Sequence, residues 1–283
     1  MPTDDSIEQA LGRVVAGVER AAWGFTNRTD MVTLENGQRV VVQRYRGGGD
    51  AEHRLRTMEA LREPAAAAGI AIPRIREADP DSEPAWVMFD VLPGVPVPED
   101  DRARPGGPGF PEMARAMGEL LARFRALPLE GLDDLWASPE RLRAAATGWA
   151  EAWPELAGVL AEVPDLFAGR PVVLAHGDYA PVNVLVEDGA ITGLLDFEAV
   201  RLADPLFDPA WWAWSVSFAP PAALETGWRP FLEGAGIDPD EPELGRRVRT
   251  LQILRMLELL AAGTLASGVA AVVENRLRSE AAG

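Results

Sequence analysis

H-G-D-Y-A-P-V-N, residues 176–183, is followed by L-L-D-F-E, residues 194–198, and these two segments carry most of the information in the sequence. They contain Asp178, Asn183 and Asp196, an ordered set of oxygen-bearing side chains that suits metal-dependent phosphoryl transfer. That chemistry needs a carboxylate to orient and deprotonate a hydroxyl group, and oxygen ligands to hold Mg²⁺ on nucleotide phosphates. The sequence therefore predicts that Asp178 is the catalytic base and that Asn183 and Asp196 bind the metal.

The residues around this set predict a β-hairpin. Val184–Val186 and Ile191–Leu195 are short apolar runs separated by the turn-forming residues 187–190. Such a hairpin places Asn183 and Asp196 at the same end of its two strands, close enough to share an ion.

The pattern H-G-D-x-x-x-x-N followed by D-x-E resembles the aminoglycoside phosphotransferase family, which has the protein-kinase-like fold. The resemblance implies a bilobal α+β molecule with a small antiparallel-sheet N-lobe and a mainly helical C-lobe. In that family the residues that match Asp178, Asn183 and Asp196 are the catalytic base and the two metal ligands. Residues 203–209 continue the resemblance, and the family's Asp that matches Asp208 braces the catalytic loop.

The resemblance also implies where the nucleotide binds. Gly24-Phe25-Thr26-Asn27 is similar to the family's short nucleotide loop, which makes Thr26 and Asn27 candidate nucleotide-binding residues. The backbone from Phe89 to Val91 would be the hinge that hydrogen-bonds the adenine ring. A plain loop is the alternative there, because backbone donors leave no side-chain signature.

The sequence contains no lysine, which excludes both a Walker A loop and the strand lysine that kinases place on the nucleotide phosphates. The candidate strand spans residues 40–46, and strand alternation puts Arg44 and Gln43 on opposite faces. We favour Arg44 as the residue that meets phosphate, because a cation suits the triphosphate charge. By spacing alone, Gln43 is an equally good candidate for the phosphate-facing position. Strand alternation agrees equally well with an Arg44 that is simply solvated at the edge of the sheet.

A helix is predicted from Ala51 to about Ala67, with Asp50 as its N-cap. Glu52 and Glu59 are the acids on this helix that could reach an arginine on the strand. The pattern does not decide between them, and both can simply be exposed.

Residues 1–91 have the pattern of an N-terminal nucleotide-binding lobe. A capping box at residues 5–8 begins a helical pattern that continues to Ala22. Strand-like runs flank Asn36-Gly37, a strong hairpin signal, and two more strands follow at 72–75 and 85–89. The composition then changes to proline and glycine, so we assign residues 92–283 to a helical C-terminal lobe with the catalytic hairpin and the substrate site.

The C-terminal part shows helical patterns at 112–127, 141–153, 154–167, 209–218, 222–232 and 242–265, the last of which can extend to 278. Trp211 and Trp214 are three residues apart and can share a helix face, whereas Trp212 points elsewhere. Core packing and an aromatic wall for a ligand are both compatible with them. Several acids near these helices could meet an amino-bearing substrate: Glu225, Glu233, Glu241, Glu243 and Glu258.

Composition excludes several other classes. The chain has no cysteine and only His53 and His176, which excludes disulfides, thiolate metal sites and a histidine-rich zinc site; His176 suits a prop of the loop better than a base. A net charge of −17 argues against nucleic acid as a partner and is compatible with a cationic substrate, although an acidic surface can serve solubility alone. No secretory signal and no membrane-spanning run are found, so we expect a cytoplasmic protein without a membrane partner.

Together these features predict a Mg²⁺-dependent kinase that transfers the γ-phosphoryl group of ATP or GTP to a hydroxyl group of a small molecule, an antibiotic or a metabolite. Two other classes stay open. A nucleotide-binding but catalytically inactive relative, acting as a binding or regulatory module, is motivated by the missing lysine. A metal-dependent hydrolase would need a second cluster of histidine or carboxylate ligands, and histidine is scarce.

Overall fold

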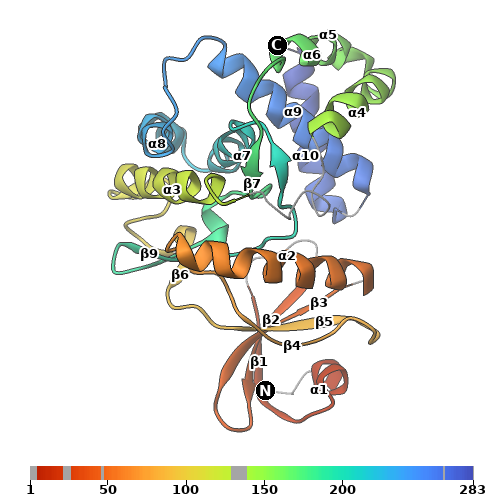
Figure 1. Cartoon of the computed structure of the whole chain (residues 1–283), viewed down its shortest axis with the longest axis vertical. Helices are drawn as coiled ribbons and strands as arrows, with labels where there is room; N and C mark the ends of the chain where they lie inside the picture. The colour runs from red at the N-terminus through yellow and green to blue at the C-terminus, as the bar shows by residue number, and fades with distance from the viewer. Residues whose placement is uncertain (1–4, 22–26, 46–47, 129–138, 264, 283) are drawn as a thin grey trace.

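The computed structural model describes residues 5–21, 27–45, 48–128, 139–263 and 265–282. The molecule has a β-sheet half at one end of its long axis and a mainly helical half at the other (Figure 1). Helix α2 (Gly48–Ala67) lies between the sheet and the helical half. The division after residue 91 stays a prediction; it falls in the connection between strand β5 (Trp86–Asp90) and strand β6 (Val95–Pro96).

The described N-terminal half contains a five-stranded antiparallel sheet in the order β1-β2-β3-β5-β4. Its strands are β1 (Val15–Arg20), β2 (Arg28–Leu34), β3 (Arg39–Arg44), β4 (Ile75–Asp79) and β5 (Trp86–Asp90). The predicted Asn36-Gly37 turn joins β2 to β3, and Gly37 has a φ of 80°, which glycine adopts without strain. The small antiparallel sheet of the predicted α+β fold is therefore confirmed.

Helix α1 (Asp5–Leu11) is shorter than its sequence pattern predicts. It ends before Gly12, whose φ of 61° is the left-handed conformation typical after a helix C-terminus. The next residues form β1, so the prediction of a helix that continues to Ala22 is wrong. The apolar spacing is present, but β-branched residues beyond Gly12 pair with β2 instead of continuing the helix.

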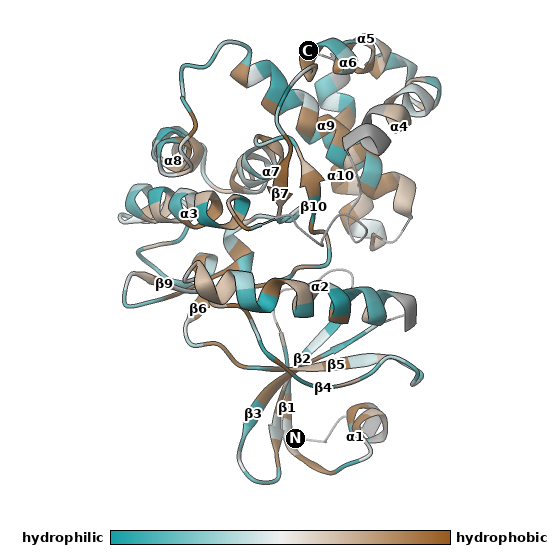
Figure 2. Cartoon of the chain, in the orientation of Figure 1, coloured by the Kyte–Doolittle hydropathy of each residue, from teal (hydrophilic) through white to brown (hydrophobic). Residues whose placement is uncertain are grey.

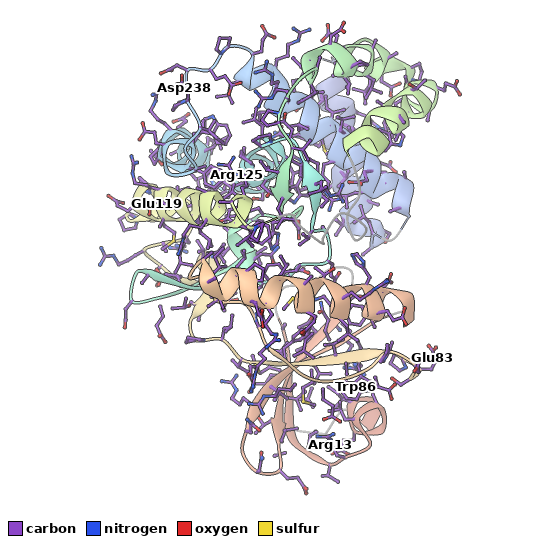
Figure 3. The ribbon with its side chains drawn as sticks, in the orientation of Figure 1. Arg13, Glu83, Trp86, Glu119, Arg125 and Asp238 are labelled. Carbon is purple, nitrogen blue, oxygen red and sulfur yellow. The ribbon has the colours of Figure 1, made fainter. Side chains whose placement is uncertain are left out.

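The two faces of the sheet are buried by different elements. Val40 and Val42 of β3 pack with residues of α1 in a small separate core, which also contains Trp86, seen close to α1 in Figure 3. Val41 and Tyr45 face the other way and belong to the main core. Because side chains alternate along a strand, the odd-numbered residues of β3 face α2 and the helical half.

The C-terminal half is mainly helical, as predicted. Its helices are α3 (Phe110–Arg125), α4 (Pro139–Ala152), α5 (Ala157–Ala161), α6 (Val163–Leu166), α7 (Phe207–Val216), α8 (Pro221–Gly234), α9 (Leu244–Ala262) and α10 (Ser267–Ala282). The pattern from 242 to 278 is two helices, because Gly263 caps α9 in the left-handed conformation with a φ of 67°. Within the described ranges, none of the helices combines the length and the apolar character that a membrane crossing needs.

Small sheets inside this half position the catalytic segments. Strands β7 (Val173–Ala175) and β10 (Arg201–Ala203) form one pair, whose apolar residues are brown in Figure 2. Strands β8 (Val184–Glu187) and β9 (Ala190–Leu194) form the predicted hairpin, and β6 (Val95–Pro96) joins its edge. Val184 lies opposite Leu194. The register therefore puts Asn183 and Asp196 at the same end of the hairpin, as predicted.

Candidate active site

Asp208, at the start of α7, holds the backbone of the loop that carries the predicted base. Its carboxylate oxygens each accept a hydrogen bond at 2.8 Å, Oδ2 from the amide of His176 and Oδ1 from the amide of Gly177. The side chain is 1% exposed, and burial raises its pKa. A carboxylate held by two backbone donors fixes the path of the chain into Asp178. This is the brace that the family resemblance implied.

Gly177 and His176 fix the same loop from within. Gly177 has a φ of 82°, and a Cβ at this position would lie 1.9 Å from the carbonyl oxygen of Ala199, so only glycine fits. His176 is fully buried, and burial lowers its pKa, which favours the neutral imidazole. Its Nε2–H donates to the Leu195 carbonyl at 2.8 Å, and its Nδ1 accepts from the Asp178 amide at 3.3 Å. His176 is thus a structural link between the two motif segments.

Asp178 is held at both carboxylate oxygens. Oδ1 accepts from the indole Nε1–H of Trp211 at 2.6 Å. Oδ2 accepts from Asn183 Nδ2 at 3.1 Å, and the same amide donates to the main-chain oxygen of Asp178 at 2.8 Å. Two side-chain donors keep the carboxylate in one orientation, which a general base needs. The sequence placed Trp211 on a helix near the motif but gave no sign of this contact.

Asp196 follows the hairpin in a strained conformation. Its φ of 63° lies in the left-handed region, which non-glycine residues adopt mainly where the surrounding structure imposes it, often at functional sites. Its Oδ1 lies 3.4 Å from Nη1 of Arg54 on α2. Arg54 is 4% exposed, and its guanidinium lies over the ring of Phe89 at 5.6 Å. The structure therefore adds a buried cation that the sequence prediction missed.

Glu198 connects this segment to the sheet. Its Oε1 accepts from Asn27 Nδ2 at 2.8 Å and from Gln43 Nε2 at 3.0 Å. The amide oxygen of Gln43 in turn accepts from the hydroxyl of Tyr45 at 2.8 Å. Asn27 and Gln43, two predicted nucleotide-binding residues, thus both bind Glu198, which follows the predicted metal ligand Asp196 by two residues.

Among the described residues of the site, three carboxylates lie around one cation, Arg54. Asp178, Asp196 and Glu198 interact electrostatically with one another or with Arg54. Burial and the neighbouring Asp196 raise the pKa of Glu198 to about 7, and burial raises the pKa of Asp196 against the opposing effect of Arg54. Burial is the largest cause of both raised pKa values, and the neighbouring carboxylates add to it. A hard cation with oxygen ligands fits such a site.

Asn183 and Asp196 offer the amide and carboxylate oxygens that Mg²⁺ prefers. No cluster of three or more histidine, cysteine or acidic side chains with metal-binding geometry exists among the residues described. Mg²⁺ commonly takes one or two protein ligands and completes its shell with phosphate and water oxygens.

The raised pKa of Glu198 predicts a specific pH dependence of stability. Between pH 4.5 and about 7 the folded protein keeps a proton on Glu198 that the unfolded chain has lost, so the free energy of unfolding falls as the pH rises through this window and levels off above it. We expect Glu198→Gln to remove this decline in the nucleotide-free protein, measured as melting temperature against pH. Glu187→Gln, at an exposed position, is the control. Equal pH slopes for wild type and Glu198→Gln would contradict the assignment.

Arg44 does not lie with these residues, which corrects the expectation that it faces the phosphates. It is 6% exposed, and its Nη2 lies 2.7 Å from Oδ2 of Asp30, which is fully buried. Arg44 shares its face of β3 with Val40 and Val42, the face covered by α1. Gln43, on the other face, is the strand residue that meets the site.

Neither helix acid pairs with the strand. Glu52 is exposed, and Glu59 is exposed and lies 3.2 Å from Arg62 on the same helix. Arg54 occupies the buried face of α2 instead, four residues before the buried Met58. The helical spacing of Arg54 and the apolar Met58 was the available sequence signal for this buried position, whereas the sequence prediction concerned only the carboxylates of this helix.

The structure describes two of the three remaining predicted nucleotide-binding residues, Phe89 and Val91. Thr26 lies outside the described residues. Phe89 is paired on both sides, with Val41 and with Ile75, whereas Val91 lies beyond the ladder and is 37% exposed. Val91 is therefore the better placed of the two for a backbone contact with a base, and that contact stays a prediction.

The acids proposed to meet an amino-bearing substrate are mostly neutralised within the protein. The ion pairs are Glu233 with Arg115, Glu241 with Arg170 and Arg247, Glu243 with Arg246, and Glu258 with Arg201 and Arg255. Glu225 is exposed. The described C-terminal helices thus do not present a concentrated acidic surface made of these residues.

A cavity of about 440 Å³ lies in the helical half. Its wall includes Arg125 and Asp238, which are labelled in Figure 3, and also Arg170 and Glu241. Arg125 donates to a backbone carbonyl, and Arg170 pairs with carboxylates, so both cations are already engaged. None of the predicted site residues lines this cavity, and we assign it no part in the chemistry.

Comparison with known proteins gives a consistent result. The model of the phosphotransferase enzyme family (APH) matches residues 17–246. An aminoglycoside 3′-phosphotransferase from Streptomyces ribosidificus is 33% identical over 156 residues, and one from Streptomyces fradiae is 30% identical over 163 residues. Each alignment covers 48% of this chain and 55% of the relative, so the chain matches about half the length of these proteins.

Solved structures share the fold over nearly the whole chain. The GDP complex of aminoglycoside 2′-phosphotransferase-IIIa superposes with a TM-score of 0.76 at 18% identity, covering 98% of this chain and 96% of that one. The macrolide 2′-phosphotransferase MphH from Brachybacterium faecium gives a TM-score of 0.61 at 23% identity, with 95% of both chains covered. At these identities the likeness concerns the fold, and it confirms the predicted kinase-like architecture.

Proposed function

Because the chain belongs to the phosphotransferase enzyme family, we propose that it is a Mg²⁺-dependent kinase that transfers the γ-phosphoryl group of a nucleoside triphosphate to a hydroxyl group of a small molecule. The observation that carries the proposal is the double anchoring of Asp178 by Trp211 and Asn183. A carboxylate fixed in this way, next to oxygen ligands for a metal, has the geometry of a base for an incoming alcohol.

Asp178 orients the acceptor hydroxyl and takes its proton. The acceptor oxygen forms a bond to the γ-phosphorus while the bond between that phosphorus and the β,γ-bridging oxygen breaks, and the nucleoside diphosphate leaves. Asn183 and Asp196 would hold Mg²⁺, which supplies positive charge to the phosphate oxygens when it is bound.

We assign the protein's own phosphate-directed cation to Arg54. A kinase without lysine needs another positive group near the triphosphate, and Arg54 is the guanidinium that contacts Asp196. Gln43 and Asn27 both bind Glu198, which interacts electrostatically with Arg54. Their neutral amide groups can contribute hydrogen bonds to the nucleotide. This replaces the earlier expectation for Arg44.

Relatives support a nucleotide donor and leave the acceptor open. Structures with this fold include complexes with GDP, and with ADP and hygromycin B. Others are named for macrolide phosphorylation. For this chain we propose ATP or GTP as the donor and an antibiotic or a related metabolite as the acceptor. The direct test is nucleotide turnover with Mg²⁺ against a panel of hydroxyl-bearing compounds, with mass spectrometry to detect a phosphorylated product. Absence of any product would favour the non-catalytic binding module.

Metal dependence can be measured without an acceptor. A ligand that binds only the folded state raises the melting temperature, so nucleotide should stabilise the protein more with Mg²⁺ than with EDTA. Asp196→Ala should remove the difference between the two conditions. Asp188→Ala, in the exposed turn of the same hairpin, should preserve it. A nucleotide-induced melting shift that is the same with Mg²⁺ and with EDTA, and is unchanged in Asp196→Ala, would contradict the assignment of Asp196 as a metal ligand.

Arg54→Gln should weaken nucleotide binding by about 10–100-fold, because charge-assisted hydrogen bonds contribute roughly 1.5–3 kcal/mol. Arg56→Gln, two residues along α2 at an exposed position, is the matched control and should bind nucleotide as wild type does. Titration calorimetry with ADP and Mg²⁺ measures both. Equal affinities for the two variants would remove Arg54 from the phosphate site.

A further inference from the structure

An aromatic stripe leads away from Asp178 along α7. Trp211 donates to Asp178 and stacks on Trp214 with ring centroids 4.2 Å apart and planes 9° apart. Trp214 meets Phe218 edge to face, with centroids 4.7 Å apart and planes at 77°. The spacing of three and then four residues places all three rings on one side of the helix and its C-terminal extension.

Exposure rises along this stripe. Trp211 is 5% exposed, Trp214 is intermediate, and Phe218 is 57% exposed. Core packing accounts for Trp211 and for Trp212, which faces Phe231 on the opposite side. It does not account for a large exposed ring continuous with the base. Aromatic side chains left partly open beside a polar site are typical of small-molecule pockets.

The charges beside the stripe do not suit a polycation. Arg255 lies over the Trp211 ring at 5.6 Å and shares Glu258 with Arg201. Two guanidinium groups therefore face one carboxylate at this point. Apart from the exposed Glu225, the acids of the surrounding helices named above are also paired with arginines, so an acceptor rich in ammonium groups would find few free acids beside the stripe. The net charge of −17 for the whole chain does not describe this local field.

We propose that the acceptor is an alcohol that presents an aromatic or apolar ring face and carries few ammonium groups, and that Trp214 and Phe218 form the platform on which it rests. The inference rests on the proposed kinase function and specifies its substrate class. This substrate class differs from the aminoglycosides for which the Streptomyces relatives are named. It also differs from the cationic substrate that is compatible with the acidic composition. Ring stacking holds the acceptor, and Trp211 keeps Asp178 turned toward its hydroxyl group.

The test measures acceptor binding directly, with the full chain saturated with ADP and Mg²⁺. The probes are phenyl β-glucoside, methyl β-glucoside, a macrolide and kanamycin, titrated by calorimetry. The first two share their hydroxyl groups and differ in the aromatic ring. We expect phenyl glucoside or the macrolide to bind several-fold more tightly than methyl glucoside and kanamycin, because its ring stacks on the platform in addition to burying apolar area.

Variants locate the binding surface. Trp214→Ala and Phe218→Ala should each weaken binding of the preferred probe several-fold or more, whereas Trp214→Phe should retain most of it. Trp228→Ala, a partly buried tryptophan in the separate cluster around Phe231, is the control. Phe218→Ala keeps the test valid if Trp214→Ala destabilises the fold, because Phe218 is already exposed.

The outcomes separate this inference from the proposed function. Tighter binding of kanamycin, binding that ignores both stripe variants, or no binding of either ring-bearing probe would each overturn the platform. Nucleotide affinity and its Mg²⁺ dependence are measured on the same samples. If the wild-type protein shows no Mg²⁺-dependent nucleotide binding, the kinase proposal is wrong. If it binds nucleotide with Mg²⁺ but the probe results contradict the platform, only the proposed acceptor class is wrong.

Discussion

Asp178→Asn should lower the rate of phosphoryl transfer by on the order of 10²–10⁴-fold, the usual contribution of a general base. Asparagine keeps the side-chain shape and an oxygen that can accept from Trp211. The bond from Asn183 to the main-chain oxygen at position 178 does not depend on the carboxylate. Nucleotide affinity and melting temperature should therefore stay near their wild-type values while turnover falls.

Steady-state kinetics with an acceptor found in the panel, together with ADP titration, separates the two effects. Asp188→Asn, in the exposed hairpin turn, should turn over normally. Unchanged turnover in Asp178→Asn would end the assignment of the base. Reduced nucleotide affinity with an unchanged rate would make Asp178 part of the nucleotide site instead.

Arg44→Ala should destabilise the folded protein by about 3 kcal/mol, while the nucleotide affinity of the folded fraction stays unchanged. Removing one partner of a buried ion pair typically costs roughly 3–5 kcal/mol, because the other charge stays buried. The lower end applies here, since Arg28 also contacts Asp30, with its Nε 3.1 Å from Oδ2. Chemical denaturation measures the free energy of unfolding, and ADP titration below the transition measures binding.

Glu19→Ala is the matched surface control. Glu19 pairs with Arg39 at 3.9 Å between side chains that are 77% and 57% exposed, respectively. Its loss should change the unfolding free energy by at most about 1 kcal/mol. Weakened nucleotide binding with intact stability in Arg44→Ala would restore Arg44 to the phosphate site.

The sequence predicted the parts of this protein that depend on neighbouring residues. The order of Asp178, Asn183 and Asp196 along the chain is local, and a hairpin of alternating residues must bring the ends of its strands together. Asn36-Gly37 and the apolar runs beside it fix a turn and a register in the same way. The α+β class and the helical C-terminal part followed from these local periodicities.

Local patterns failed where a distant element chooses between two equivalent options. Strand alternation separates Gln43 from Arg44 but does not say which face α1 covers. That depends on Ile7 and Leu11, which are distant in sequence and pack on Val40 and Val42. The helical pattern through Ala22 likewise gave way to pairing of β1 with β2.

The tertiary structure alone decided which charges and rings surround the predicted base. Arg54 reaches Asp196 across 142 residues of sequence, and Trp211 reaches Asp178 across 33. Glu198 joins Asn27 and Gln43 across 171 and 155 residues. The sequence determined which groups can do the chemistry, because motif order and hairpin geometry are local. Their partners were decided by long-range packing, because burial and hydrogen bonding select one contact among many that spacing permits.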